Sequence, residues 1–183
     1  MEMWDVLDRE GEPTGKAVSR VEAMKGGKFL SGEYHLSVEV FIVNSKGDLL
    51  FTKRSPEKST FGGYWETTAG SAITGEGSSE TMIREIFEEI GLSIEKEELL
   101  FQKRIVEEIR HQLMDLYFLK KDFDLEDIVF QEGETCDAKW VPLEWKILDD
   151  ETIVPQMRER MRFVWFDLMS FAEGIVTLVT ESL

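Results

Sequence analysis

Residues 70–92 read GSAITGEGSSETMIREIFEEIGL, and this stretch is the starting point for interpreting the whole chain. Gly70 is followed by five residues, then Glu76, then seven residues, and then the run REIFEEIGL. Apolar residues recur at helical spacing in its second half, at Met82, Ile83, Ile86 and Ile90. This period predicts an amphipathic helix with one face turned to the core.

Both ends of the predicted helix carry local signals. Ser78 or Ser79 is expected to be the N-cap, because a serine hydroxyl can accept a hydrogen bond from a free amide of the first turn. Gly91 is expected to end the helix, since glycine adopts the left-handed conformation at little cost. The sequence therefore predicts one helix bounded by these residues.

The opposite side of this helix is acidic. At about 100° per residue, Glu85, Glu88 and Glu89 fall in one sector, with Arg84 at its edge. Because like charges at this spacing destabilise a helix by roughly a few tenths of a kcal/mol per pair, we expect a positive partner there. Mg²⁺ binds a few carboxylates together with substrate phosphates. The alternative is a solvated acidic face with an Arg84–Glu88 pair.

The composition fits a single domain over residues 1–183. The chain is 42 % hydrophobic and includes five Trp and twelve Phe, enough for one good core. No apolar run approaches the length that crosses a bilayer, and the N-terminus is acidic where a signal peptide would be basic. We therefore expect a cytoplasmic protein with no membrane partner. The single cysteine, Cys136, excludes an internal disulfide.

The net charge of −16 argues against nucleic acid binding, which draws on clustered Lys and Arg. A small polyanionic substrate would need metal ions and a local basic patch. Lys53, Arg54 and Lys58 form such a cluster and are candidates for phosphate contact; the alternative is an exposed, charged strand end. Trp65 is a candidate for stacking on a base, although a tryptophan is more often a core residue.

Strands surround the central helix in the predicted order of elements. An N-terminal hairpin extension covers about residues 1–32, with a turn at residues 11–15. Further strands are predicted at residues 35–44, 49–54, 99–108, 112–120 and 128–130. The C-terminal helices are predicted at about residues 150–160 and 162–173, so that they span about 150–173.

The spacing of Gly70, Glu76 and REIFEEIGL resembles the signature of the Nudix hydrolases. That signature is G, five residues, E, seven residues, R-E-U-x-E-E-x-G-U, where U is a bulky aliphatic residue, and the match holds at every fixed position. The resemblance implies an α/β (α+β) protein with the Nudix fold, an α/β/α sandwich with a mixed central sheet. In that fold the signature, or Nudix box, forms a loop, a helix and a loop. The resemblance also implies a homodimer.

Outside the box, the chain is similar to a branch of the family close to the type I isopentenyl diphosphate isomerases. The likeness lies in WDVLDREGEPTG at residues 4–15, EYHLSVEVFIVNSKGDLLFTKRSPEK at residues 33–58, and E-x-x-D-x-x-W at Glu134, Asp137 and Trp140. Those isomerases use a cysteine just before the box glycine and a histidine just after it, where this chain has Ala69 and Ser71. His35 matches one of their metal-binding histidines. Because alanine cannot transfer a proton, the isomerase hypothesis lacks its central group.

The hydrolase resemblance implies roles by matched position. Its metal ligands would be Glu85, Glu88, Glu89 and the carbonyl of Gly70. They would hold about one to three Mg²⁺ ions, or Mn²⁺, which would neutralise a diphosphate and lower the pKa of a bound water. Arg84 would orient the carboxylates by charge-assisted hydrogen bonds. In this family the base for the water is a box glutamate or a carboxylate from a downstream loop, and the downstream candidates are Glu134, then Glu132 and Glu108.

Three functions remain to be compared. The leading hypothesis is Mg²⁺-dependent hydrolysis of a diphosphate linkage in a nucleoside diphosphate derivative or related metabolite, by water attack at phosphorus. The alternative is an enzyme like isopentenyl diphosphate isomerase that acts on an isoprenoid diphosphate. A non-catalytic nucleotide-sensing protein is the third, and the complete set of Glu85, Glu88 and Glu89 argues against it.

Overall fold

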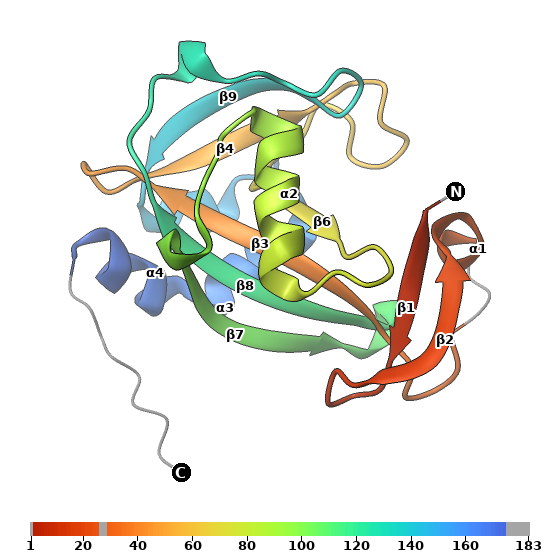
Figure 1. The fold of residues 1–183 in the computed structure, drawn as a ribbon. Helices are drawn as coiled ribbons and strands as arrows, with labels where there is room; N and C mark the ends of the chain where they lie inside the picture. Colours follow the sequence, from red (N-terminus) through yellow and green to blue (C-terminus); the bar gives the residue numbers. More distant parts are fainter. Residues whose placement is uncertain (1, 26–28, 175–183) are drawn as a thin grey trace. The chain divides into compact units, whose positions relative to one another are not determined.

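The computed structural model describes residues 2–25 and 29–174 (Figure 1). The chain divides into two compact units. The first unit comprises Met1–Val40, Thr68–Glu88 and Leu92–Tyr117, and the second comprises Phe41–Thr67, Glu89–Gly91 and Phe118–Leu183. The box helix and two of the strands contribute residues to both units. None of the helices in these described residues has the length and apolar character that a membrane crossing requires.

The first unit contains the N-terminal hairpin and most of the box. Its elements are β1 (Met3–Leu7), β2 (Pro13–Ser19), α1 (Arg20–Met24), β3 (His35–Val43), β6 (Ala69–Ser71), α2 (Ser78–Ile90), β7 (Leu99–Glu107) and β8 (Gln112–Lys120). Of these, β3, α2 and β8 extend into the second unit. The 3-10 turns η1 (Lys96–Glu98) and η2 (Glu108–Arg110) flank β7. The predicted hairpin and strands are therefore confirmed, whereas α1 was not predicted.

The hairpin of β1 and β2 has a small core of its own. The two strands pair antiparallel, with Trp4 opposite Val18. Both residues are buried together with Val6, and Phe29 packs against them. At the end of β2 the Ser19 hydroxyl accepts the amide of Glu22 over 3.2 Å, so that Ser19 caps the unpredicted α1.

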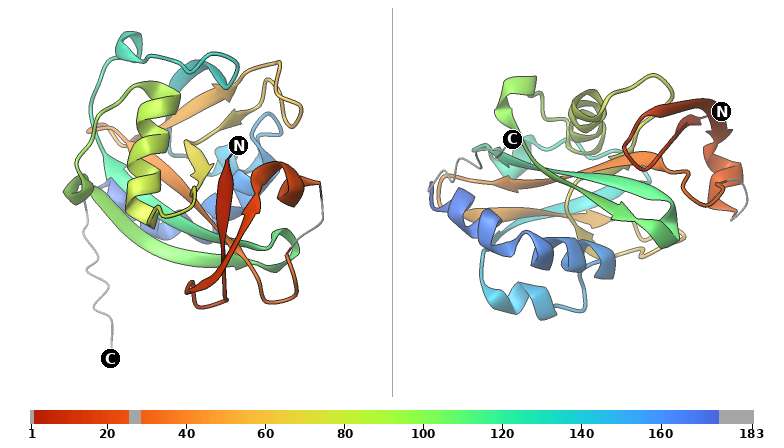
Figure 2. Two further views of the ribbon diagram at one scale, coloured as in Figure 1. Left: turned by 45° about the vertical axis from the view of Figure 1, so that its right-hand side comes forward. Right: turned by 90° about the horizontal axis from the view of Figure 1, so that it is seen from below.

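The second unit contains the remaining strands and the C-terminal helices. Its elements are β4 (Asp48–Arg54), β5 (Trp65–Glu66), η3 (Leu125–Asp127), β9 (Thr135–Pro142), η4 (Trp145–Asp149), α3 (Pro155–Phe163) and α4 (Trp165–Ala172). The two predicted C-terminal helices are confirmed, although α3 begins at Pro155, a residue suited to the first turn. Met157 and Met161 of α3 are buried, and α3 and α4 lie along one side of the strands of this unit (Figure 2).

The main sheet has the strand order β5-β4-β3-β8-β7, with β6 paired to β3 and β9 paired to β4. All nine residues of β3 are buried, which fits a strand with neighbours on both edges. The pairings of β3 with β6 and of β4 with β5 and β9 are antiparallel, and a parallel bridge joins Trp65 to Ile153. The protein thus belongs to the predicted α+β class, with a mixed sheet and helices.

The apolar stripe of the box helix packs as its period predicts. In the first unit, α2 lies across β3 and β8 (Figures 1 and 2). Met82 and Ile86 are fully buried, and Ile83 is half-buried at the edge of the stripe. Burial of this face fixes the rotation of the helix, so the acidic side of the helix points away from the core.

Candidate functional site

Gly70 lies in β6, where it pairs with Val38 of β3. The carboxylate of Glu85 fills the space that a side chain at position 70 would need. A Cβ placed on Gly70 would lie 1.9 Å from Glu85 Cδ and 2.1 Å from Glu85 Oε1. Real Cβ atoms do not approach other atoms so closely, so any side chain here would displace Glu85. The glycine predicted as a metal ligand therefore lies directly against a carboxylate predicted as another.

Arg84 binds three carboxylates of the box. Its Nε donates to Glu76 Oε1 over 2.8 Å, and its Nη2 donates to Glu76 Oε2 over 3.0 Å. Its Nη1 donates to Glu85 Oε1 over 2.8 Å and to Glu88 Oε2 over 2.9 Å. Nη2 also donates to the carbonyl of Ser71 over 3.0 Å. A planar guanidinium can fix several oxygens at once, so these contacts suit the orienting role predicted for Arg84.

Burial acts on the ionisation of the box glutamates. Burial raises the pKa of Glu85, and the charge and hydrogen bond of Arg84 offset only part of this rise. Burial also acts to raise the pKa of Glu76, but bonds from Arg84 and from the Ile73 amide lower it overall. The side chain of Glu85 is 14 % exposed, against 43 % for Glu88. A further cation beside Glu85 would offset the cost of burying its charge.

The donor chemistry of the box fits a hard divalent cation. Glu76, Glu85 and Glu88 surround a single cation, Arg84, so negative charge is in excess. Among residues 2–25 and 29–174, however, no three His, Cys, Asp or Glu side chains are arranged around one ion position. The contacts of Arg84 explain this, because the guanidinium itself holds Glu85 and Glu88. A metal ion would compete with Arg84 for these two carboxylates.

The box helix begins earlier than predicted. Its first residue is Ser78, and the amide of Thr81 donates to the carbonyl of Gly77 over 3.0 Å. The N-cap position is therefore Gly77, and the prediction of Ser78 or Ser79 was wrong. The Ser78 hydroxyl is hydrogen-bonded to the Tyr117 hydroxyl instead, at 2.7 Å. The prediction for the other end is confirmed, since Gly91 follows the last helical residue with φ +71°.

Glu89 falls in the second unit together with the end of the helix. Its side chain is half-buried, and its carbonyl accepts the amide of Gln131 over 3.4 Å. The carbonyl of Ile90 accepts the amide of Val129 over 3.1 Å. Residues 128–130, predicted to begin a strand, therefore form none, because this segment bonds the last turn of the helix and not a neighbouring strand.

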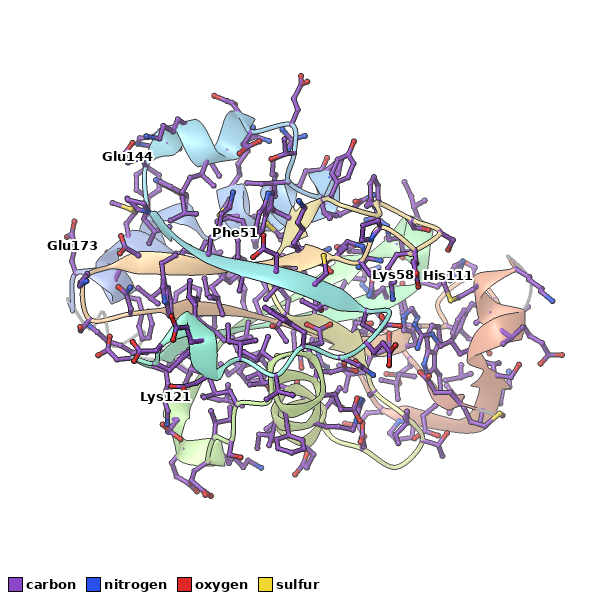
Figure 3. The ribbon with its side chains drawn as sticks, turned by 90° about the horizontal axis from the view of Figure 1, so that it is seen from above. Phe51, Lys58, His111, Lys121, Glu144 and Glu173 are labelled. Carbon is purple, nitrogen blue, oxygen red and sulfur yellow. The ribbon has the colours of Figure 1, made fainter. Side chains whose placement is uncertain are left out.

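Two of the predicted phosphate-binding cations are ion-paired in the second unit. Arg54 Nη1 lies 2.7 Å from Glu66 Oε1. Lys58, labelled in Figure 3, pairs with Glu134, the carboxylate predicted to act as base. The Ser55 amide donates to the carbonyl of Glu134 over 2.7 Å, which holds the loop after β4 against the start of β9. Lys58 and Glu134 are therefore brought together.

Lys53 and Trp65 form a separate group. They are register partners in β4 and β5, and Lys53 Nζ lies 5.4 Å from the centroid of the Trp65 ring. Because successive strand residues point to opposite faces, Arg54 projects from the other face, where it contacts Glu66. Trp65 is half-buried and is not a core residue. The four predicted substrate-binding residues thus form two groups on two faces.

Two residues were missed in the sequence analysis, one beside Trp65 and one in the box. Lys139 of β9 places its Nζ 3.9 Å from the centroid of Trp65, and no local pattern announces this contact. Glu76 was given no role, yet it binds two donors of Arg84 and accepts the hydroxyl of Thr81 over 3.1 Å. Its fixed place in the signature was a usable signal.

The other two carboxylates named as candidate bases are placed differently. In the first unit, Glu108 accepts the hydroxyl of Tyr34 and pairs with Arg9. These contacts, first of all the hydrogen bond from Tyr34, lower the pKa of Glu108. In the second unit, Glu132 is exposed. Glu134 is therefore the candidate base that lies beside a predicted phosphate-binding cation.

The residues that matter for the isomerase hypothesis lie in the first unit. Ala69 and Ser71 flank Gly70 in β6, and the Ser71 hydroxyl lies 3.1 Å from that of Ser37. His35 stacks on Trp4 at 4.2 Å between ring centroids, and burial lowers its pKa to about 4. His35 is therefore a neutral, packed side chain, and position 69 offers no group for proton transfer.

Comparison with known proteins identifies the family. The model of the NUDIX domain matches residues 33–171. An uncharacterised Nudix hydrolase of Listeria monocytogenes is 36 % identical over 145 residues, which cover 79 % of this chain and 82 % of the relative. An isopentenyl-diphosphate Delta-isomerase of Corynebacterium diphtheriae is 28 % identical over 174 residues, covering 91 % of this chain and 79 % of that protein.

Solved structures support the same fold. Protein DR0079 of Deinococcus radiodurans is similar with a TM-score of 0.69 at 22 % identity, over 88 % of this chain and 98 % of that one. The bifunctional NMN adenylyltransferase/ADP ribose pyrophosphatase of Francisella tularensis, solved with AMP and a Mn ion, has a TM-score of 0.59 at 14 % identity, over 81 % and 46 % of the two chains. This chain has the Nudix fold and belongs to the family of the Nudix hydrolases.

Proposed function

We propose that this protein hydrolyses a diphosphate linkage in a nucleoside diphosphate derivative or related metabolite, with Mg²⁺ as cofactor. The observation that carries the proposal is the contact set of Arg84, which gathers Glu76, Glu85 and Glu88 beside Gly70. Carboxylates in excess over the guanidinium that they contact supply the oxygen donors that a hard divalent ion prefers.

Glu85, Glu88, Glu89 and the carbonyl of Gly70 would hold the metal. When bound, the ion would neutralise the diphosphate and lower the pKa of a water molecule. Arg84 would keep its two bonds to Glu76, which anchor the guanidinium while the other carboxylates turn to the ion. The role of Arg84 in this scheme is to position ligands, not to bind substrate.

Arg54 and Lys58 would bind the phosphate oxygens. Each already pairs with a carboxylate, so an incoming phosphate would exchange one anionic partner for another. Release of Lys58 would free the carboxylate of Glu134 to accept a proton from the attacking water. The water oxygen bonds to phosphorus, the bond from phosphorus to the leaving oxygen breaks, and the proton passes to Glu134.

The test is a turnover assay with a panel of nucleoside triphosphates, sugar nucleotides, dinucleotides and isopentenyl diphosphate in the presence of Mg²⁺. We expect Glu85→Gln and Glu88→Gln to lower the hydrolysis of an accepted substrate by about 100-fold or more. Glu80→Gln is the matched control, because Glu80 lies on the same helix with a side chain that is 60 % exposed.

Each alternative has its own outcome in this panel. Isomerisation of isopentenyl diphosphate without phosphate release would favour the isomerase hypothesis over hydrolysis. Equal turnover by wild type, Glu85→Gln and Glu88→Gln would contradict the proposal. Nucleotide binding by calorimetry together with no turnover of any member would favour the sensing protein.

A further inference from the structure

Lys53, Trp65 and Lys139 form what we call the cation–indole platform of the second unit. Lys53 pairs with Trp65 across β4 and β5, and Lys139 pairs with Phe51 across β4 and β9. Because strand residues alternate between faces and register partners share one, all three platform residues project from the face of β4 that carries Phe51. Figure 3 labels Phe51 on the side of β4 toward the C-terminal helices.

The two ammonium groups converge on one ring. Lys139 Nζ lies 3.9 Å and Lys53 Nζ 5.4 Å from the centroid of Trp65, and both distances are within the range of a cation–π contact. The indole contact stabilises each cation, but it does not remove the repulsion between them. The platform therefore concentrates positive charge in a chain whose net charge is −16.

The platform lacks the anionic partners that the neighbouring cations have. Within the described residues, neither Lys53 nor Lys139 has a carboxylate within 4.0 Å, whereas Arg54 pairs with Glu66 on the opposite face. The indole N–H of Trp65 likewise has no acceptor in this part of the chain. Asp137, the register partner of Lys53, receives the amide of Ala138 and does not pair with the lysine. Within the described residues, the two ammonium groups and the indole N–H thus have no hydrogen-bond acceptor.

The segment that leads into α3 adds further positive character. The amide of Trp65 donates to the Thr152 carbonyl over 2.8 Å, and the amide of Val154 donates to the Trp65 carbonyl over 2.9 Å. Val154 is the N-cap of α3 and has no side-chain acceptor, so the first amides of this helix lack a capping partner. In the same turn, Nε of Arg158 is buried and, among the described residues, has no hydrogen-bond partner.

The carboxylate of Asp150 lies near two of these cations, Lys139 and Arg158. Asp150 accepts the amide and the hydroxyl of Thr152 at 2.8 and 2.6 Å, and these bonds, assisted by the charges of Lys139 and Arg158, lower its pKa. Asp150 is thus already engaged by its own turn. The charge of Asp150 is shared between Lys139 and Arg158, so these two cations outnumber it.

We infer that the cation–indole platform is an anion-binding site for a phosphate or diphosphate group, formed by residues other than the carboxylates of the box. The ligand is a multiply charged oxyanion, because two ammonium groups lie against one ring and neither has a carboxylate in contact within the described residues. The group can be a free oxyanion or part of a larger metabolite. Lys53 and Trp65 then serve this second site and not the phosphate held by Arg54 and Lys58.

The experiment measures binding without divalent metal, so catalysis does not contribute. Inorganic pyrophosphate is titrated in EDTA into ¹⁵N-labelled protein, and the indole N–H signal of Trp65, identified by Trp65→Phe, is followed by NMR. We expect a saturable shift, and a Kd about tenfold weaker in Lys53→Gln and Lys139→Gln. Lys146→Gln is the matched control, because Lys146 lies in the same unit, pairs with Glu144 and is 76 % exposed.

Two further titrations identify the source of the anion and separate this test from the proposed hydrolysis. A titration with ADP distinguishes the sources, since tighter binding of ADP than of pyrophosphate assigns the site to a phosphate group of a larger metabolite, and the reverse assigns it to the free oxyanion. Glu88→Gln should bind pyrophosphate like the wild type, so failure of the proposed hydrolysis leaves this test intact. No saturable shift up to about 10 mM, or equal affinity in wild type and Lys139→Gln, would overturn the inference.

Discussion

The two units of this protein gather opposite charges around a central group. In the first, one guanidinium, that of Arg84, holds three carboxylates, so negative charge is left over. In the second, the ring of Trp65 collects two ammonium groups that have no carboxylate in contact within the described residues. The comparison teaches that unbalanced charge indicates the ligand: the first arrangement suits a cation, and the second suits an anion.

The largest expected effect concerns Glu134, the carboxylate of the second unit that has a catalytic role in the proposal. Glu134→Gln should lower kcat by about 10²- to 10⁴-fold, because a glutamine cannot accept the proton of the attacking water. Steady-state kinetics with an accepted diphosphate over a pH series makes the measurement.

Two variants serve as references for Glu134. Glu126→Gln changes an exposed carboxylate of the same unit and should keep the activity of the wild type. If Glu132→Gln lost the activity while Glu134→Gln kept it, the base would be Glu132. The ion pair of Glu134 with Lys58 would then have no role in catalysis.

The next effect concerns the acid stability of the first unit. Burial lowers the pKa of His35 from 6.5 to about 4, so between these values the unfolded chain binds a proton that the folded protein does not. The contribution of His35 to the free energy of unfolding should be fully present above pH 6.5. The free energy of unfolding should then fall by about 2–3 kcal/mol on acidification to pH 4.5. Urea unfolding at several pH values measures this slope.

Two variants test the origin of this pH dependence of stability, and each replaces one histidine by asparagine. His35→Asn should flatten the slope, since no group at position 35 then titrates. His111→Asn removes the other histidine and should retain the part of the slope that His35 causes. An unchanged slope in His35→Asn would mean that the acid sensitivity arises elsewhere.

A smaller loss should follow from filling the space at Gly70. Gly70→Ala should destabilise the protein by about 1–3 kcal/mol and reduce turnover, because the new Cβ would collide with the Glu85 carboxylate. Gly77→Ala is the control within the same box, since the atoms nearest to its Cβ would be those of the Glu80 carboxylate, at the end of an exposed side chain. Equal losses in both variants would show that Gly70 is not special for the position of Glu85.

The smallest effect tests the charge excess of the cation–indole platform. Raising the salt concentration should stabilise the wild type by about 0.5–1 kcal/mol more than Lys139→Met, because screening relieves a repulsion that only the wild type has. Urea unfolding at low and high salt gives the difference, with Lys146→Met as the control. The same salt response in Lys139→Met would mean that the two lysines do not repel each other.

Periodic features of this sequence could be predicted, because local physics fixes them. The stripe through Met82 and Ile86 follows from the helical period and is buried as expected. Gly91 ends the helix for a conformational reason that is independent of the rest of the chain. The class of the fold and the family followed from the same stretch.

Tertiary partners decided what the sequence could not show. The N-cap prediction failed because the Ser78 hydroxyl bonds Tyr117, a residue of β8, and the helix starts at Ser78 itself. The contact of Lys139 with Trp65 depends on the pairing of β9 with β4, which no local pattern encodes. Lys53, Arg54 and Lys58 were predicted as one cluster because of their shared charge, although strand alternation already places Lys53 and Arg54 on opposite faces.

The close approach of Glu85 to Gly70 has a consequence for the accuracy of the box. The Glu85 carboxylate rests on the main chain of β6, in which Gly70 pairs with Val38 of β3, while Arg84 holds one of its oxygens. The sheet backbone therefore limits the position of this carboxylate on the side that faces Gly70. Surface mutations that leave this ladder intact should not blur the position of Glu85, which makes the box a robust module to carry into a redesigned scaffold.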